Sequence, residues 1–113
     1  MPPQPETGAQ PLTRMTIPML AVLAALTDGG GGWYGLRIAG ATALRTGTVY
    51  PLLTRLERAG WVTATWEDKN SPDEKKDPGA RRKYYQLTPQ GRENALRALR
   101  QREEALARFR SPG

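Results

Sequence analysis

The chain has 113 residues, carries 17 Lys+Arg against 11 Asp+Glu, and contains neither cysteine nor histidine. Zinc fingers, disulfide frameworks, thiol nucleophiles and imidazole bases are therefore excluded, and we expect no enzyme, no metal site and no cofactor. The acidic pairs 67–68 and 103–104 are poor catalytic candidates, because the side chains of adjacent residues diverge. The net charge of +6 favours a polyanionic partner, nucleic acid before an acidic membrane surface.

Hydropathy along the chain places no segment in a membrane. The longest apolar run is shorter than the about 18 residues that span a bilayer, and no basic segment precedes it as in a signal peptide. We therefore expect a cytoplasmic protein with no membrane partner. Residues 1–14 are rich in proline and are expected to form a flexible N-terminal arm. The remaining chain buries only a modest core, which favours an oligomer.

A buried first helix is expected directly after this arm. Thr16 is a suitable N-cap, Pro18 falls in the first turn, and strong helix formers follow as far as Asp28. Because this segment is apolar nearly all round, we expect it to be buried on all sides.

Four consecutive glycines, 29–32, separate this helix from the next. A phosphate-binding loop is one interpretation, but no Gly-Lys-Ser/Thr follows and no strand precedes, so a flexible loop between helices is favoured. A second helix is predicted from about Trp33 to Ala39, with Trp33 and Leu36 turned inward and Ile38 as a further candidate. Residues 40–45 then form a short link or an extra helical turn.

The third helix is the most informative segment. It is expected to begin at Thr46 or Thr48 as N-cap and to end at Gly60, a suitable left-handed residue. A start at Thr48 leaves Pro51 in the first turn, whereas a start at Thr46 costs one intrahelical hydrogen bond. Its apolar positions follow helical spacing and form one stripe: Val49, Leu52, Leu53, Leu56 and Ala59.

Two segments of alternating character, 61–66 and 82–87, predict β-strands that pair as a hairpin. The residues between them, 67–81, are too polar to be buried and are expected to form a mobile tip. Trp33, Trp61 and Trp66 have two interpretations. They either form a stacking platform for single-stranded bases or, as we favour, pack in the core.

A fourth helix is expected from Thr88 as cap and Pro89 as first residue to about Arg110. Four apolar residues recur along it with spacings that suit a helix: Leu96, Leu99, Leu106 and Phe109. Such a narrow stripe is typical of a contact between two helices, so we assign this helix to dimerisation.

Three helices, a strand, a long tip, a strand and a final helix make a winged helix-turn-helix, a fold that is mainly α with a small β-hairpin. We expect a winged helix DNA-binding domain over 15–88 and a C-terminal dimerisation helix over 89–110. Such a module lays its third helix in the major groove of double-stranded DNA. Candidate DNA-binding residues lie on the solvent face of the third helix and at the root of the second strand: Thr48, Tyr50, Thr54, Arg55, Arg58, Arg81, Arg82, Lys83 and Tyr84.

The chemistry of these side chains suits nucleic acid. Hydroxyl and guanidinium groups reach phosphates and base edges, and arginine is the usual bidentate reader of guanine. The alternative is that the arginines only solvate the helix and that the cations of the strand form an ordinary charged edge. Because neighbours on a strand face opposite ways, Arg82 shares a face with Tyr84, and Lys83 shares the other with Tyr85.

Two motifs carry a resemblance to a known family. Residues 50–60 read Tyr-Pro-x-Leu-x-x-Leu-Glu-x-x-Gly, and residues 82–91 read Arg-Lys-Tyr-Tyr-x-Leu-Thr-x-x-Gly. In this combination the chain resembles the PadR-like transcriptional regulators over about residues 15–110, and in particular their small members with a short C-terminal helix. The resemblance implies a homodimeric repressor that binds an inverted repeat in double-stranded DNA.

Two differences from the family bear on its ligands. Residues 34–36 read Tyr-Gly-Leu where the family usually has His-Gly-Tyr, so a contact made by that histidine is lost. Many relatives sense aromatic or multidrug ligands in an apolar pore of the dimer. Phe109 is the only aromatic residue of the expected fourth helix, so a small-molecule effector stays an open question.

Two other classes of function stay open at the level of the sequence. The chain could be a winged-helix module for protein–protein interaction, or a non-specific basic nucleic-acid binder. The exposed basic face of the third helix favours specific DNA binding over the first, and its Tyr-Pro sequence favours it over the second.

Overall fold

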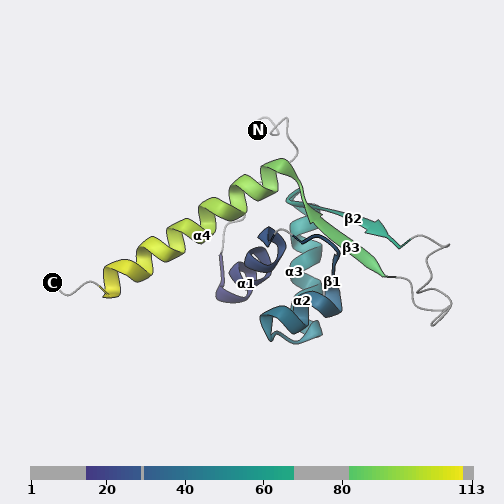
Figure 1. Cartoon of the computed structure of the whole chain (residues 1–113), viewed down its shortest axis with the longest axis horizontal. Helices are drawn as coiled ribbons and strands as arrows, with labels where there is room; N and C mark the ends of the chain where they lie inside the picture. The colour runs from purple at the N-terminus through teal and green to yellow at the C-terminus, as the bar shows by residue number, and fades with distance from the viewer. Residues whose placement is uncertain (1–14, 29, 68–81, 111–113) are drawn as a thin grey trace, which may run out of the picture.

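The structure, a computed structural model, describes residues 15–28, 30–67 and 82–110, so the expected arm and most of the expected tip lie outside the described residues. The first three helices gather beside a small sheet, whereas α4 leads away from it and ends on the side opposite the β2–β3 hairpin, the wing (Figure 1). None of the described helices is apolar over a length that would cross a membrane. The elements are α1 (Ile17–Thr27), β1 (Trp33–Tyr34), α2 (Gly35–Thr42), α3 (Thr46–Arg58), β2 (Val62–Trp66), β3 (Lys83–Leu87) and α4 (Pro89–Arg110).

Helix α1 begins and ends as the sequence predicts. The Met19 N–H donates to Thr16 Oγ1 (3.3 Å), and Pro18 lies in the first turn. The prediction of burial on all sides is wrong at one edge, where Ile17 is 65% exposed. The reason is that α2, α3 and α4 pack on only part of the circumference of α1. The buried side chains are Met19, Leu20, Val22, Leu23 and Leu26.

The segment after the glycines differs from the prediction. Trp33 and Tyr34 are not helical but form β1, which pairs antiparallel with β3 through Trp33–Tyr85 and Tyr34–Tyr84. The sheet therefore has three strands in the order β1–β3–β2 instead of the two strands of a hairpin. This pairing draws Trp33 into the core, as predicted for its side chain, although in a different kind of element.

Helix α2 consequently starts at Gly35 and runs to Thr42, so the expected link includes an extra helical turn. The prediction that Leu36 turns inward is wrong, because its side chain is 64% exposed. With the helix starting at Gly35, the core-facing positions are Ile38 and Ala39.

Helix α3 starts at Thr46, and Arg45 occupies the N-cap, so neither threonine is the cap. The Arg45 carbonyl accepts the first helical hydrogen bonds, from the N–H groups of Thr48 and Val49. Pro51 consequently lies inside the helix, where its missing N–H removes one intrahelical hydrogen bond. All five residues of the predicted apolar stripe are buried, as expected.

A tight turn joins α3 to β2. Gly60 adopts a φ of 79°, which glycine accepts without steric cost. In this conformation the Gly60 N–H donates to the Glu57 carbonyl (3.1 Å) and the Trp61 N–H donates to the Leu56 carbonyl (2.9 Å). The turn directs Trp61 into the core, which confirms the interpretation of that tryptophan as a packing residue. For Trp66, at the far end of β2, the prediction of core packing is wrong, because that side chain is 56% exposed.

The base of the wing contains a buried carboxylate. Glu67 is only 7% exposed, so the prediction that residues 67–81 are too polar for burial is wrong at their first position. Its N–H donates to the Arg82 carbonyl (2.7 Å), and its carboxylate accepts from the Arg82 N–H (3.3 Å). Burial is tolerated because the carboxylate has hydrogen-bond partners.

The start of α4 is fixed to the turn after α3. Thr88 caps the helix as predicted, because its Oγ1 accepts from the Gly91 N–H (2.9 Å). The same hydroxyl donates to the Gly60 carbonyl (2.9 Å), and the Thr88 N–H donates to the Trp61 carbonyl (2.9 Å). Gly91 lies so close to the Trp61 backbone that a Cβ atom would overlap its carbonyl group.

Gly91→Ala is therefore expected to lower the free energy of unfolding by about 2–3 kcal/mol, because backbone must move to admit the methyl group. Gly40→Ala is the matched control, since Gly40 is exposed within α2 and a Cβ there would meet no atom. This control is expected to be stabilised by about 0.5–1 kcal/mol. Thermal unfolding followed by circular dichroism compares the two, and equal stabilities would show that Gly91 does not fix α4.

Candidate nucleic-acid interface

The exposed face of α3 gathers the predicted DNA-binding residues of that helix. Because the apolar stripe is buried, the opposite face is open to solvent, and each of the five is exposed there: Thr48, Tyr50, Thr54, Arg55 and Arg58. Arg55 and Arg58 lie in the last turn, where the helix dipole favours positive charge. The face therefore presents hydroxyl and guanidinium groups on one rigid element.

The position of α3 relative to α2 depends on two features of the helix-turn-helix. Gly35, at the first position of α2, lies against the ring of Tyr50, and any side chain at position 35 would overlap that ring. At the other end of α2, the Thr42 hydroxyl donates to the Ile38 carbonyl (2.7 Å), and Ala43 turns the chain with a φ of 60°. The two helices are thus held at a close approach that places α3 at the surface.

Sequence reasoning missed Arg45, which lies at the N-cap of α3 with its side chain exposed. Helix N-termini attract anions such as phosphate, and an arginine there adds to the attraction. Its position directly before the Thr-Gly-Thr start of the helix was the available signal. With Arg45 included, the exposed side chains of α3 and its N-cap carry three arginines against one acid, Glu57.

The wing presents a second group of cations and aromatic rings. The Arg82 guanidinium lies over the Tyr34 ring, 4.7 Å from its centroid, and the rings of Tyr34 and Tyr84 meet edge to face at 5.7 Å. Arg82 and Tyr84 thus share one face of β3, as alternation along a strand predicts, while Tyr85 is buried on the other. Arg81, also predicted to contact DNA, lies outside the described residues.

Lys83 contacts both the wing and α3. Its Nζ lies 3.4 Å from Glu57 Oε1 and 5.7 Å from the centroids of both the Trp66 and the Tyr85 rings. Burial raises the pKa of Tyr85, and the charge of Lys83 partly opposes that effect. Sequence reasoning did not foresee that Lys83 links the wing to α3 through an acid of the recognition helix.

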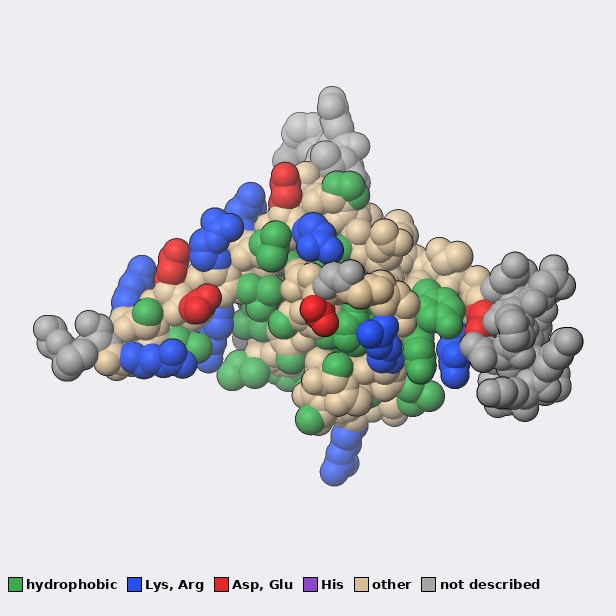
Figure 2. Space-filling model, viewed as in Figure 1, with side chains coloured by type: hydrophobic (Ala, Val, Ile, Leu, Met, Phe, Trp, Pro, Cys, Tyr) green, Lys and Arg blue, Asp and Glu red, His purple; other side chains and the backbone are tan. Residues whose placement is uncertain are grey.

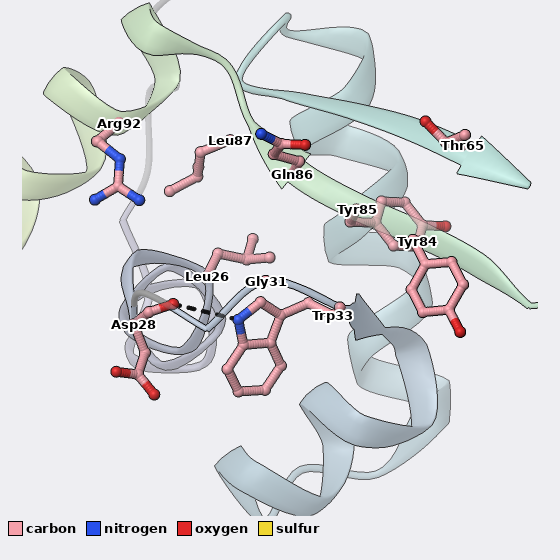
Figure 3. Close-up of a pocket in the computed structure, with 11 residues that line it drawn as sticks. Leu26, Asp28, Gly31, Trp33, Thr65, Tyr84, Tyr85, Gln86, Leu87 and Arg92 are labelled. Atoms are coloured by element: carbon pink, nitrogen blue, oxygen red, sulfur yellow. Dashed lines mark hydrogen bonds between the residues drawn. The ribbon is translucent and has the colours of Figure 1, made fainter. Parts of the chain in front are cut away.

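A hollow of about 460 Å³ lies away from α3, between the end of α1, strand β3 and the start of α4. Figure 3 shows Trp33 in its floor, with the indole N–H donating to the Asp28 carbonyl at 3.5 Å, and Arg92 of α4 at its rim. Tyr84 lines the opposite end. Within residues 15–28, 30–67 and 82–110, no group of three or more acidic residues could hold a metal ion.

Comparison with known proteins agrees with this geometry. The family model of the transcriptional regulator PadR-like family matches residues 35–97, more than half of the chain. No curated protein matches the chain significantly in sequence.

Solved structures share the fold. A PadR family transcription regulator from Clostridium difficile is 24% identical with a TM-score of 0.59, over 82% of this chain and 98% of that protein. BpsR from Bordetella bronchiseptica, whose DNA binding is regulated by 6-hydroxynicotinic acid, is 22% identical with a TM-score of 0.65, over 93% of this chain and 73% of that protein. The PcaV transcriptional regulator from Streptomyces coelicolor is 22% identical with a TM-score of 0.61, over 84% and 63% of the two chains.

The second of these neighbours binds DNA and the other two are transcription regulators, and all three share the winged helix with a small antiparallel sheet with this chain. The family match covers the helix-turn-helix, both strands of the wing and the first part of α4, which are the elements that form the exposed basic face. The chain therefore belongs to the PadR-like family of transcriptional regulators.

Proposed function

We propose that this protein is a homodimeric repressor that binds an inverted repeat in double-stranded DNA. The observation that carries the proposal is the exposed face of α3, which presents three arginines and several hydroxyl groups beside a wing that bears further cations. In the proposed complex α3 enters the major groove and Arg55 and Arg58 reach base edges, while Arg82 contacts the backbone. Such a regulator acts in the cytoplasm, where its DNA lies.

The proposed division of the chain is a winged helix over residues 15–88 and a dimerisation helix over 89–110. Ala95, in the first half of α4, is buried, and this half of the helix packs on α1. Residues 106–110 at the end of the helix are all exposed, including Leu106 and Phe109, the latter 91% exposed. Figure 2 shows the C-terminal part of α4 projecting from the body, with arginine side chains spaced along the helix.

A second copy of the chain is the proposed partner of the projecting helix. Leu96, Leu99, Leu106 and Phe109 form the proposed contact, and three of them are exposed large apolar residues. Two such helices related by a two-fold axis would bury these side chains against one another. The dimer would then present two copies of α3 to successive major grooves of one duplex, and would repress by covering a promoter.

A small-molecule effector has a place in this arrangement. The hollow shown in Figure 3 lies at the junction of the winged helix with α4, so a ligand there would contact Trp33, Tyr84 and Arg92. Its binding would couple the wing to the angle of the dimerisation helix.

Selection from a random duplex library, followed by a change of spacing, tests the proposed function. A two-fold dimer is expected to enrich an inverted repeat whose half-site centres are separated by about 10 bp or a multiple of it. Inserting about 5 bp between the half-sites turns one of them to the opposite side of the duplex, so specific binding in a mobility shift at physiological salt is expected to be lost.

Three outcomes separate the candidate functions. Enrichment of an inverted repeat with strict spacing supports the repressor. Binding that ignores the spacer identifies a non-specific basic nucleic-acid binder, because attraction to phosphate does not depend on helical phase. A protein that retains no duplex at all would favour a winged-helix module for protein–protein interaction.

A further inference from the structure

A cleft of about 310 Å³ separates the recognition helix α3 from the wing. Its walls combine aromatic rings with cations: Tyr50 of α3 on one side, and Trp66, Arg82, Lys83 and Tyr85 on the other. This volume is at the lower end of the range for ligand sites, which is about 300–1,000 Å³. The cleft is therefore large enough for a small anionic group. It lies on the surface proposed to contact DNA, so a DNA phosphate is the group considered.

A sugar–phosphate strand would cross this cleft in the proposed complex. In a duplex, one backbone strand separates the major groove from the adjacent minor groove. With α3 in the major groove and the wing beyond it, that strand must pass between them. Arg82 and Lys83 would face its phosphates, and the hydroxyl of Tyr50, a residue that is 45% exposed, would supply a hydrogen-bond donor from the helix side.

In the free protein, however, Lys83 already has an anionic partner. Its Nζ lies 3.4 Å from Glu57 Oε1, and both side chains are about one-third or more exposed. An exposed ion pair of this kind contributes only about 0–1 kcal/mol, so Lys83 gives up Glu57 at little cost when a phosphate is offered. Until then, the carboxylate neutralises Lys83 and repels phosphates that approach α3 without entering the cleft.

We infer that the cleft between α3 and the wing binds one DNA phosphate and that Glu57 is a selectivity residue. In the free protein Glu57 pairs with Lys83, and in the specific complex the DNA phosphate replaces the Glu57 carboxylate as the partner of Lys83. This inference rests on the proposed function and adds a means of discriminating between specific and non-specific DNA. Loose, non-specific contacts leave Lys83 paired with Glu57, so they gain little from it. Only a duplex with α3 fully in the groove places a phosphate where Lys83 and Tyr50 can both reach it.

Glu57→Gln tests the inference on a duplex of unrelated sequence. Releasing Lys83 is expected to raise non-specific affinity on the order of threefold to tenfold and to steepen the slope of log K against log salt by about 0.9, the value for one extra phosphate contact. Affinity for the enriched inverted repeat should rise less, so the ratio of specific to non-specific affinity falls. Glu93→Gln, which removes an exposed carboxylate from α4, is the matched control and should change the ratio little.

A double-mutant cycle separates partner exchange from simple loss of negative charge. In a Lys83→Gln background, Glu57→Gln is expected to have no effect on non-specific affinity beyond that of Glu93→Gln, because the cation that Glu57 restrains is gone. An unchanged effect in that background would overturn the inference. Circular dichroism confirms that each variant is folded, as expected for exposed positions.

Neutral methylphosphonate groups, placed one at a time along the enriched duplex, test the seat itself. The wild-type protein should bind more weakly when one particular phosphate in each half-site is neutral, and the affinity of the Lys83→Gln variant should not depend on that phosphate. No such position would overturn the inference while leaving the proposed function intact. Failure to enrich any inverted repeat, by contrast, would contradict the proposed function, and the Glu57 cycle on the unrelated duplex would still report partner exchange.

Discussion

Leu56→Asp is expected to unfold the protein, whereas Thr54→Asp, two residues away on the same helix, is expected to leave it folded but to weaken its specific binding of DNA. Leu56 is fully buried in the middle of the apolar stripe of α3. A carboxylate at this position would have to enter the core without a partner, at a cost of several kcal/mol. Small domains have only about 5–15 kcal/mol of stability, so the folded state would be lost or severely depleted.

Thr54 lies on the opposite face and is exposed, with its hydroxyl donating to the Tyr50 carbonyl (3.1 Å). An aspartate there would cost little folding free energy, but it would face the phosphates and base edges of the groove. We expect specific affinity to fall at least tenfold, since loss of one base contact alone costs about 1–3 kcal/mol.

The pair of variants tests which way the recognition helix faces. Circular dichroism measures the fold, and fluorescence anisotropy of a labelled duplex measures binding. A folded Leu56→Asp protein would show that this face of α3 is not the core. A Thr54→Asp protein that bound DNA as tightly as wild type would remove the exposed face of α3 from the interface.

Leu106→Glu combined with Phe109→Glu is expected to convert the proposed dimer into folded monomers. Both residues are exposed and lie in the last five residues of α4, the helix that leads away from the sheet in Figure 1, and Phe109 is almost completely exposed within one chain. Their replacement should therefore leave the winged helix intact, while four charges placed in the apolar contact of the two-fold dimer would prevent association. Sedimentation equilibrium over a range of concentrations measures the change.

The control introduces the same number of carboxylates elsewhere on the helix. Gln101→Glu with Ala107→Glu changes two exposed residues outside the proposed contact and should leave the dimer in place. Monomers produced by the first pair are expected to lose at least a hundredfold in affinity for the inverted repeat, because each half-site is then bound independently. Identical sedimentation of the two double variants would contradict dimerisation through α4.

Local patterns in the sequence were sufficient for most of the fold. The apolar stripe of α3, the glycine that ends it and the Thr-Pro start of α4 each depend on interactions within one helix or its first turn. Such signals act over three to five residues, so they are readable without knowledge of the rest of the chain. The same stripe determines which residues of α3 face solvent, and it therefore predicted most of the candidate interface.

Contacts between distant segments decided the remainder. Trp33 and Tyr34 are strand residues because Tyr85 and Tyr84 lie opposite them, and this pairing moved the start of α2 and exposed Leu36. No pattern within residues 33–39 indicates pairing with a strand about 50 residues away, so the local sequence favours a helix there.

Contacts between distant segments also explain why the sequence did not predict the ion pair between Glu57 and Lys83 at the candidate site. Glu57 and Lys83 are 26 residues apart, and only the packing of the wing against α3 brings the carboxylate within 3.4 Å of the ammonium group. By composition alone the sequence determined that the chain is basic and has neither cysteine nor histidine, and by helical periodicity it determined the exposed face of α3. The tertiary structure decided which cations on that surface are restrained by an acid, because the strength of a charge pair depends on distance in space and not along the chain.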